Sequence, residues 1–179
     1  MNLIETFNEL ETKSDKGTTH DYLNGYYNDT FTPYKYKEIN LLEIGIHKGA
    51  SLILWNTFFT NAKIVGLDNE DWNVKEEGNT IIKICNAYSD EIVNFFDDEQ
   101  FDFIIDDGPH TLQSQLTTIK KYLPKVKVGG KLIIEDIQSE LDLLELVGSA
   151  SDTGMEYNIF DLRNNKGRYD DIILEIIKK

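Results

Sequence analysis

The segment from Leu41 to Ser51 constrains the fold of this chain more than any other feature. An apolar run ends in Glu43, two glycines separated by three residues follow, and an apolar, helix-like pattern comes next. A strand that passes through a tight turn into a helix has this pattern. Because glycine lets the backbone approach a bound molecule closely, the segment also predicts a place for a nucleotide-like ligand.

The chain after residue 38 alternates between strand-like and helix-like patterns. Strands are expected at residues 39–46, 63–67, 80–85, 101–105 and 131–134, and helices at 51–59, 90–96, 112–123 and 139–147. This alternation predicts βαβ units and a parallel sheet covered on both faces. Two final apolar runs, 155–160 and 172–177, flank a turn-rich segment at 164–167 and suggest a hairpin. One antiparallel strand is therefore expected at or near the end of the sheet.

The first 37 residues differ in character from the rest. Residues 2–13 have apolar side chains at helical spacing and predict a short amphipathic helix. Residues 14–37 are polar and rich in tyrosine, which predicts a loop or lid with a helical turn, or a connection whose aromatic side chains pack onto the core. We expect residues 1–179 to form a single domain, with residues 1–37 as a helical lid or cap.

Composition excludes several classes of partner. A hydrophobic content of 40% argues for a folded globule, and a formal charge of −14 makes nucleic acid an unfavourable partner. The single cysteine, Cys85, lies in an apolar strand-like run and is expected to be buried and structural. Neither a signal peptide nor a membrane span is recognisable, so we expect a cytoplasmic protein. The aromatic-rich N-terminal third could contribute to a homo-oligomer.

Polar residues follow five successive strands, at the edge of a parallel sheet where ligands bind. They are Glu43, Gly45 and Gly49; Asp68 and Asn69; Asn86, Ala87 and Tyr88; the run Asp106-Asp107-Gly108-Pro109-His110; and Glu135 and Asp136. Asp68 ends the strand after the glycine turn, where an acid can accept hydrogen bonds from ribose hydroxyls.

The spacing Glu-x-Gly-x-x-x-Gly at residues 43–49 differs from the dinucleotide fingerprint and resembles the first motif of class I S-adenosylmethionine-dependent methyltransferases. Residues 14–22, 41–51, 106–110 and 129–136 resemble motifs of the macrocin (TylF-type) and mycinamicin sugar O-methyltransferases. The resemblance runs from about residue 14 to about residue 137. It implies a Rossmann-like, seven-stranded, mostly parallel α/β sheet with a C-terminal antiparallel hairpin and helices on both faces.

The resemblance also implies roles for individual residues. The cofactor S-adenosylmethionine would contact Glu43, Gly45, Gly49, Ser51, Asp68, Asn69, Ala87, Tyr88 and Asp106. His110 resembles the general base of the family, since an imidazole can accept a proton at neutral pH. His20 and Tyr22 lie in the presumed lid, where they could line the acceptor pocket.

Three carboxylates, Asp107, Glu135 and Asp136, are expected to meet across two neighbouring strand ends. Such groups repel one another unless a cation neutralises them, and oxygen ligands favour a hard ion such as Mg²⁺. Capping of the following helices is the alternative from the residues alone. The resemblance favours the metal.

These features predict a Mg²⁺-dependent O-methyltransferase that acts on a sugar hydroxyl of a glycan or glycosylated product. Two alternatives remain open: a non-sugar diol as acceptor, and a catalytically inert cofactor-binding module of a glycan-processing assembly. The second is motivated by Pro109 and Ala87, which depart from the family pattern. A nicotinamide-dependent oxidoreductase is disfavoured, because the chain contains no Tyr-x-x-x-Lys pair.

Overall fold

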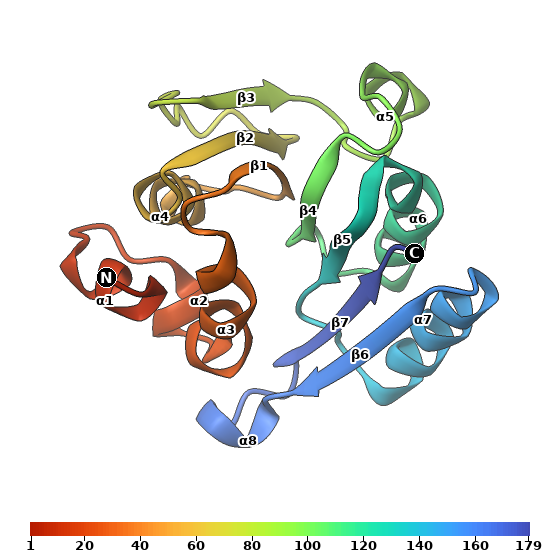
Figure 1. The fold of residues 1–179 in the computed structure, drawn as a ribbon. Helices are drawn as coiled ribbons and strands as arrows, with labels where there is room; N and C mark the ends of the chain where they lie inside the picture. Colours follow the sequence, from red (N-terminus) through yellow and green to blue (C-terminus); the bar gives the residue numbers. More distant parts are fainter.

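A computed structural model describes all residues, 1–179, and has one seven-stranded sheet at its centre (Figure 1). The strand order is β3-β2-β1-β4-β5-β7-β6. The strands are β1 (Glu38–Ile44), β2 (Asn61–Asp68), β3 (Thr80–Ile84), β4 (Phe101–Asp106), β5 (Val126–Ile134), β6 (Glu156–Asp161) and β7 (Ile172–Ile177). The order reverses direction beside β1, which places the ends of β1 and β4 at the position where open α/β sheets bind ligands.

The predicted parallel sheet with a closing hairpin is confirmed. Strands β1 to β5 run parallel to one another, whereas β7 runs antiparallel to both β5 and β6. Strand β5 begins five residues earlier than expected, at Val126, because Val126 pairs with Phe101 of β4 ahead of a register shift that precedes Lys131. A short helix, α8 (Arg163–Lys166), occupies the connection that was expected to be a turn.

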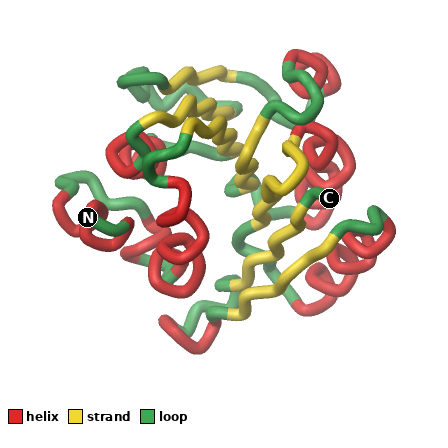
Figure 2. Tube along the Cα trace, in the orientation of Figure 1, coloured by secondary structure: helices red, strands yellow, loops and turns green.

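Helices cover the two faces of the sheet in separate groups (Figures 1 and 2). Helix α4 (Ala50–Phe58) shares one face with the N-terminal elements, and α5 (Asp90–Phe95), α6 (Leu112–Tyr122) and α7 (Glu140–Asp152) cover the other. The N-terminal elements are α1 (Leu3–Glu9), α2 (Asp15–Thr18), the π-helical turn η1 (Leu23–Tyr27), α3 (Asn28–Phe31) and the 3₁₀ turn η2 (Thr32–Tyr34); a further 3₁₀ turn, η3 (Leu123–Lys125), follows α6. None of the helices combines the length and hydropathy that crossing a bilayer would require.

Hydroxyl side chains set where the helices after the strands begin. Ser89, Thr111 and Ser139 are the N-caps of α5, α6 and α7, and each side-chain oxygen accepts a hydrogen bond from a backbone N–H of the first turn. A cap satisfies an N–H group that has no partner within the helix. These caps therefore also fix where the loops leaving β3, β4 and β5 end.

The N-terminal segment is part of the hydrophobic core. Tyr22, Tyr26, Tyr27 and Phe31 are buried and pack with Trp55 of α4 and with aliphatic side chains of the sheet. Burying one large side chain contributes roughly 1.5–3 kcal/mol. The segment is mostly helical. Its aromatic residues pack onto the core, as expected for a connection whose aromatic side chains are buried.

Candidate functional site

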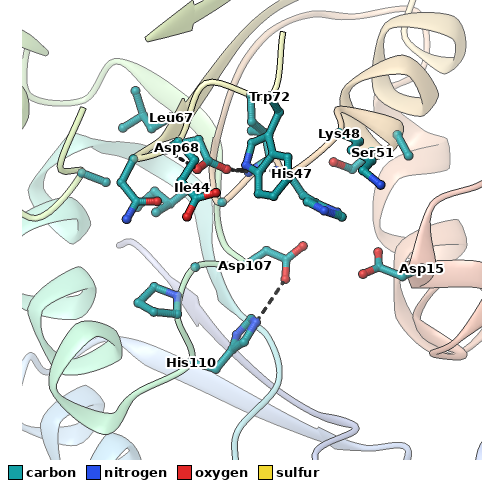
Figure 3. Close-up of a pocket in the computed structure, with 18 of the residues that line it drawn as sticks. Asp15, Ile44, His47, Lys48, Ser51, Leu67, Asp68, Trp72, Asp107 and His110 are labelled. Carbon is teal, nitrogen blue, oxygen red and sulfur yellow. Dashed lines mark hydrogen bonds and ion pairs between the residues drawn. The ribbon is translucent and has the colours of Figure 1, made fainter. Parts of the chain in front are cut away.

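A cavity of about 970 Å³ lies beyond the carboxyl ends of β1, β2 and β4 (Figure 3). Loops that follow these strands and β3 form one wall, and α2 with the residues before it forms the other. Most of the predicted cofactor residues line it, together with one predicted metal ligand, Asp107, and the predicted base, His110; the cofactor residues are Gly45, Ser51, Asp68, Asn69, Ala87 and Tyr88. Gly49, Glu43, Asp106, Glu135, Asp136, His20 and Tyr22 do not line it.

The glycine turn brings two strand-end loops into contact. Gly45 has φ +82°, and a Cβ there would collide with the backbone carbonyl of Asp107. Gly49 has φ +77°, and a Cβ there would collide with the side chain of Val74. Positive φ and close backbone approach are the two conditions that favour glycine over other residues. The turn thus closes the floor of the cavity between β1 and β4.

Asp68 is fixed by the glycine turn beside it. Its Oδ2 accepts hydrogen bonds from the backbone N–H groups of Ile46 (3.0 Å) and His47 (2.9 Å), and its Oδ1 accepts from the N–H of Glu70 (2.9 Å). The ring of Trp72 packs edge-on against His47, with 4.5 Å between centroids. This end of the cavity combines a rigid carboxylate with an aromatic wall.

Asp106 supports the loop after β4 from behind the cavity. It is buried, and its carboxylate accepts from the hydroxyl of Tyr88 (3.2 Å), the N–H of Gly108 (3.2 Å) and the hydroxyl of Thr118 (2.6 Å). Burial raises the pKa of Asp106, and these three donors oppose the rise. The contacts tie the loop that carries Asp107 and His110 to β3 and α6.

A buried lysine from the N-terminal segment neutralises the carboxylates at the strand ends. The ammonium of Lys16 lies 2.7 Å from Asp107 Oδ2 and 3.4 Å from Glu43 Oε1, and it also donates to Glu135 Oε2. Burial by itself lowers the pKa of Lys16, but Asp107 and Glu135 raise it well above its usual range. Lys16 therefore provides a fixed positive charge at the centre of this group.

Glu135 points into the core and has both oxygens engaged by the N-terminal segment. Oε1 accepts a hydrogen bond from the hydroxyl of Tyr27 at 2.6 Å, and Oε2 accepts from Lys16. Burial raises the pKa of Glu135 to about 7, although Lys16 opposes the rise. In this geometry Glu135 has no free oxygen directed at the cavity.

Asp107, His110 and Asp136 form a group whose potential ligand atoms all lie within 4.8 Å of one another. His110 Nε2 is 3.5 Å from Asp136 Oδ2 and 3.8 Å from Asp107 Oδ1, the contact drawn in Figure 3. His110 and Asp136 have φ of +53° and +54°. Left-handed backbone at residues other than glycine is strained and is concentrated at functional sites.

The predicted acceptor residues His20 and Tyr22 are buried behind Asp136. The Tyr22 hydroxyl donates to Asp136 Oδ1 at 2.5 Å, and His20 Nδ1 lies 2.6 Å from Asp171 Oδ1. The two rings stack with 4.8 Å between centroids. Both residues thus contact Asp136 from the side that faces away from the cavity.

Sequence reasoning missed Lys16, Tyr27 and Asp15. Lys16 and Tyr27 partner strand-end carboxylates from a polar, tyrosine-rich segment, and Asp15 lines the cavity. One signal was available for Lys16: buried carboxylates need a counter-charge, and none of the residues predicted to form the site is a lysine or arginine. Cys85 also differs from expectation, since it is half-buried and lines the cavity.

Comparison with protein families places this site in a known context. The family described as "Methyltransferase domain" matches residues 42–137, more than half of the chain. The match includes the glycine turn, Asp68, the loop after β4 and the two acids after β5.

Individual proteins give a consistent result. The chain is 33% identical over 133 residues to demethylmacrocin O-methyltransferase of Streptomyces fradiae, which covers 68% of this chain and 33% of that protein. It is 31% identical over 125 residues to mycinamicin VI 2''-O-methyltransferase of Micromonospora griseorubida, covering 63% and 30%. This chain thus spans about a third of the length of the curated relatives it matches.

A solved structure shares the whole fold. The MycE methyltransferase from the mycinamycin biosynthetic pathway, in complex with Mg, SAH and mycinamycin VI, has a TM-score of 0.75 and 22% sequence identity. The match covers 99% of this chain and 54% of that chain. At this identity the likeness establishes the fold.

Proposed function

Because this chain belongs to the methyltransferase domain family, we propose that it is a Mg²⁺-dependent O-methyltransferase that uses S-adenosylmethionine to methylate a sugar hydroxyl. The main support is one cavity that is lined by Asp68 at one end and by Asp107 and His110 at the other, with Asp136 grouped beside Asp107 and His110. An adenosyl ligand fits the first end, and a divalent ion fits the second.

The residues at the Asp68 end fit S-adenosylmethionine. Although Asp68 accepts three backbone hydrogen bonds, carboxylate oxygens have further acceptor capacity, which ribose hydroxyls can use. Trp72, Ala87 and Tyr88 supply apolar surface for an adenine ring. A Cβ at Gly108 would collide with the Tyr88 hydroxyl, so glycine there keeps the loop after β4 close to the cavity.

The donor set at the other end fits Mg²⁺ through two carboxylates. Asp107 Oδ1 and Asp136 Oδ2 face His110, while the other oxygen of each is held by Lys16 and Tyr22. Mg²⁺ is commonly bound by one or two carboxylates and keeps several positions for water or substrate. Glu135, from the sequence-predicted trio, would act by orienting Lys16.

The chemistry of methyl transfer follows from these positions. When bound, the cofactor supplies a methyl group on a positively charged sulfur, and Mg²⁺ lowers the pKa of a nearby acceptor hydroxyl. His110 Nε2 takes the hydroxyl proton. With the cofactor bound, the acceptor oxygen would form a bond to the methyl carbon as the carbon–sulfur bond broke, which would leave the sulfur as a neutral thioether. No residue needs to protonate a leaving group.

A sugar acceptor is supported by the activities of relatives. One matching protein of Streptomyces olivaceus is an 8-demethyl-8-alpha-L-rhamnosyl tetracenomycin-C 2'-O-methyltransferase, and another of Streptomyces antibioticus is an L-olivosyl-oleandolide 3-O-methyltransferase. Adjacent hydroxyls of a sugar could approach the ion together, which would fix the oxygen that receives the methyl group.

Transfer of a labelled methyl group from S-adenosylmethionine to a panel of glycosides tests the proposal. We expect transfer that EDTA abolishes and Mg²⁺ restores. Replacing His110 with alanine should lower the rate by roughly 10²–10⁴-fold, the contribution of a general base. Gln113→Ala, an exposed change three residues away, is the matched control and should keep full activity. Transfer that persists in EDTA would contradict the metal's role.

A further inference from the structure

The cavity wall opposite the strand-end loops presents one negative charge, on Asp15. Thr12, Lys13, Asp15 and Thr18 make up this wall. The ammonium of Lys13 donates to the backbone carbonyls of Phe7 (2.5 Å) and Asn8 (2.9 Å) and is thereby held away from a ligand. Figure 3 shows the carboxylate of Asp15 directed across the cavity toward Asp107.

Asp15 is also the least engaged acid near the centre of the cavity. Asp68 accepts three backbone hydrogen bonds, and Asp107 is paired with Lys16 at 2.7 Å. The side chain of Asp15 accepts a hydrogen bond only from the Ser14 hydroxyl, at 3.3 Å. It forms no ion pair within 4 Å. The fourth lining acid, Glu70, lies at the other end, where it borders a smaller cavity with Trp72.

Glu43, the acid of the glycine motif, cannot perform the role expected for it. It is fully buried and does not line the cavity. Its Oε2 accepts from the Ser51 hydroxyl (2.9 Å) and Trp55 Nε1 (3.0 Å), and Oε1 faces Lys16. A positively charged ligand group in this part of the cavity must therefore find another carboxylate.

Asp15 carries its charge under ordinary conditions. Partial burial raises the pKa of Asp15, but the neighbouring Lys16 ammonium lowers it, and the net effect is a pKa below the usual value. Asp15 can therefore bind a cation as an ionised carboxylate.

The shape of the cofactor determines which of its positively charged groups can reach Asp15. The sulfonium carries three arms: the adenosyl group, assigned to the Asp68 end; the methyl group, assigned to Asp107 and His110; and an aminobutyrate arm. The remaining direction leads toward α2 and the first turn of α4, where Figure 3 shows Asp15, Lys48 and Ser51 on one side of the cavity. We propose that Asp15 binds the α-ammonium of this arm, with Lys48 and the start of α4 available to its carboxylate. The inference rests on the proposed use of S-adenosylmethionine.

Binding of two ligands tests this assignment without any methyl transfer. S-adenosylhomocysteine has the aminobutyrate arm, whereas 5′-methylthioadenosine keeps the adenosyl group and lacks that arm. Both are titrated calorimetrically into the wild-type protein, Asp15→Asn and Glu11→Gln. The last is a matched control, because it removes an exposed charge of the same segment outside the cavity. Circular dichroism checks that each variant folds.

We expect Asp15→Asn to weaken S-adenosylhomocysteine binding roughly 10- to 100-fold, the effect of losing a charge-assisted hydrogen bond, and to leave 5′-methylthioadenosine binding unchanged. Glu11→Gln should change neither. Equal weakening of both ligands, no change in either, or tighter S-adenosylhomocysteine binding would overturn the role of Asp15. Tighter binding would mean that Asp15 faces the carboxylate of the arm. If the wild-type protein binds neither ligand, the proposed function itself fails.

Discussion

Two acids that follow strands of the sheet, Asp68 in the cavity wall and Glu135 behind it, are held in different ways. Asp68 is fixed by three backbone N–H groups, two in the glycine turn after β1 and one in its own loop, all within 22 positions in the sequence. Glu135 is fixed by Tyr27 and Lys16, which lie 108 and 119 positions away. The first acid depends on a local turn, and the second depends on docking of the N-terminal segment. Substitutions in that segment should therefore disturb Glu135 and Asp107 even though the motifs at the strand ends are unchanged.

The most severe test of this difference is Lys16→Met. The change leaves the carboxylates of Glu43, Asp107 and Glu135 without their shared cation. Removing one partner of a buried ion pair costs about 3–5 kcal/mol, so the free energy of unfolding should fall by about that much. Urea unfolding measures it. Lys63→Met, at an exposed position of β2, should stay within about 0.5 kcal/mol of wild type, and a similar value for Lys16→Met would refute the cation's role.

A smaller effect is expected from Tyr27→Phe. The hydroxyl of Tyr27 is the hydrogen-bond donor to Glu135 Oε1, so its loss leaves a buried carboxylate oxygen unsatisfied. The cost should be about 1–3 kcal/mol, measured by the same unfolding experiment. Tyr36→Phe provides the comparison, because Tyr36 is 73% exposed and its loss of a hydroxyl should have no measurable effect. Equal stability of the two variants would show that Glu135 does not need the donor.

The smallest effect should come from Ser51→Ala on the local side. The Ser51 hydroxyl donates to Glu43 Oε2, but Trp55 Nε1 donates to the same oxygen at 3.0 Å and remains in the variant. We expect a loss of about 0.5–1 kcal/mol, at the low end for a single hydrogen bond. If Ser51→Ala lowers the free energy of unfolding as much as Tyr27→Phe, the second donor to Glu43 does not compensate for the loss of the first. The proposed difference between Glu43 and Glu135 would then be wrong.

Sequence reasoning succeeded where the signal was local. The apolar run at 41–44, the glycines at 45 and 49 and the acid at 68 predicted β1, the turn and the end of β2, because each follows from strand periodicity or backbone freedom. Sequence order also suggested that the loops after β4 and β5 are neighbours, and these strands are paired. The side-chain directions of adjacent residues were harder: Asp136 turns toward His110, while Glu135 turns into the core.

The sequence by itself determined the α/β sheet, the glycine turn and the edge at which the polar residues gather, since these depend on residue spacing along one strand or one turn. Only the tertiary structure decided the partner of each acid, because the position of Lys16 or Tyr27 relative to a strand end depends on how the N-terminal helices pack against α4 and the sheet. Spacing along the chain carries no information about contacts across 90 or more residues, and the charge balance of this cavity is made by such contacts.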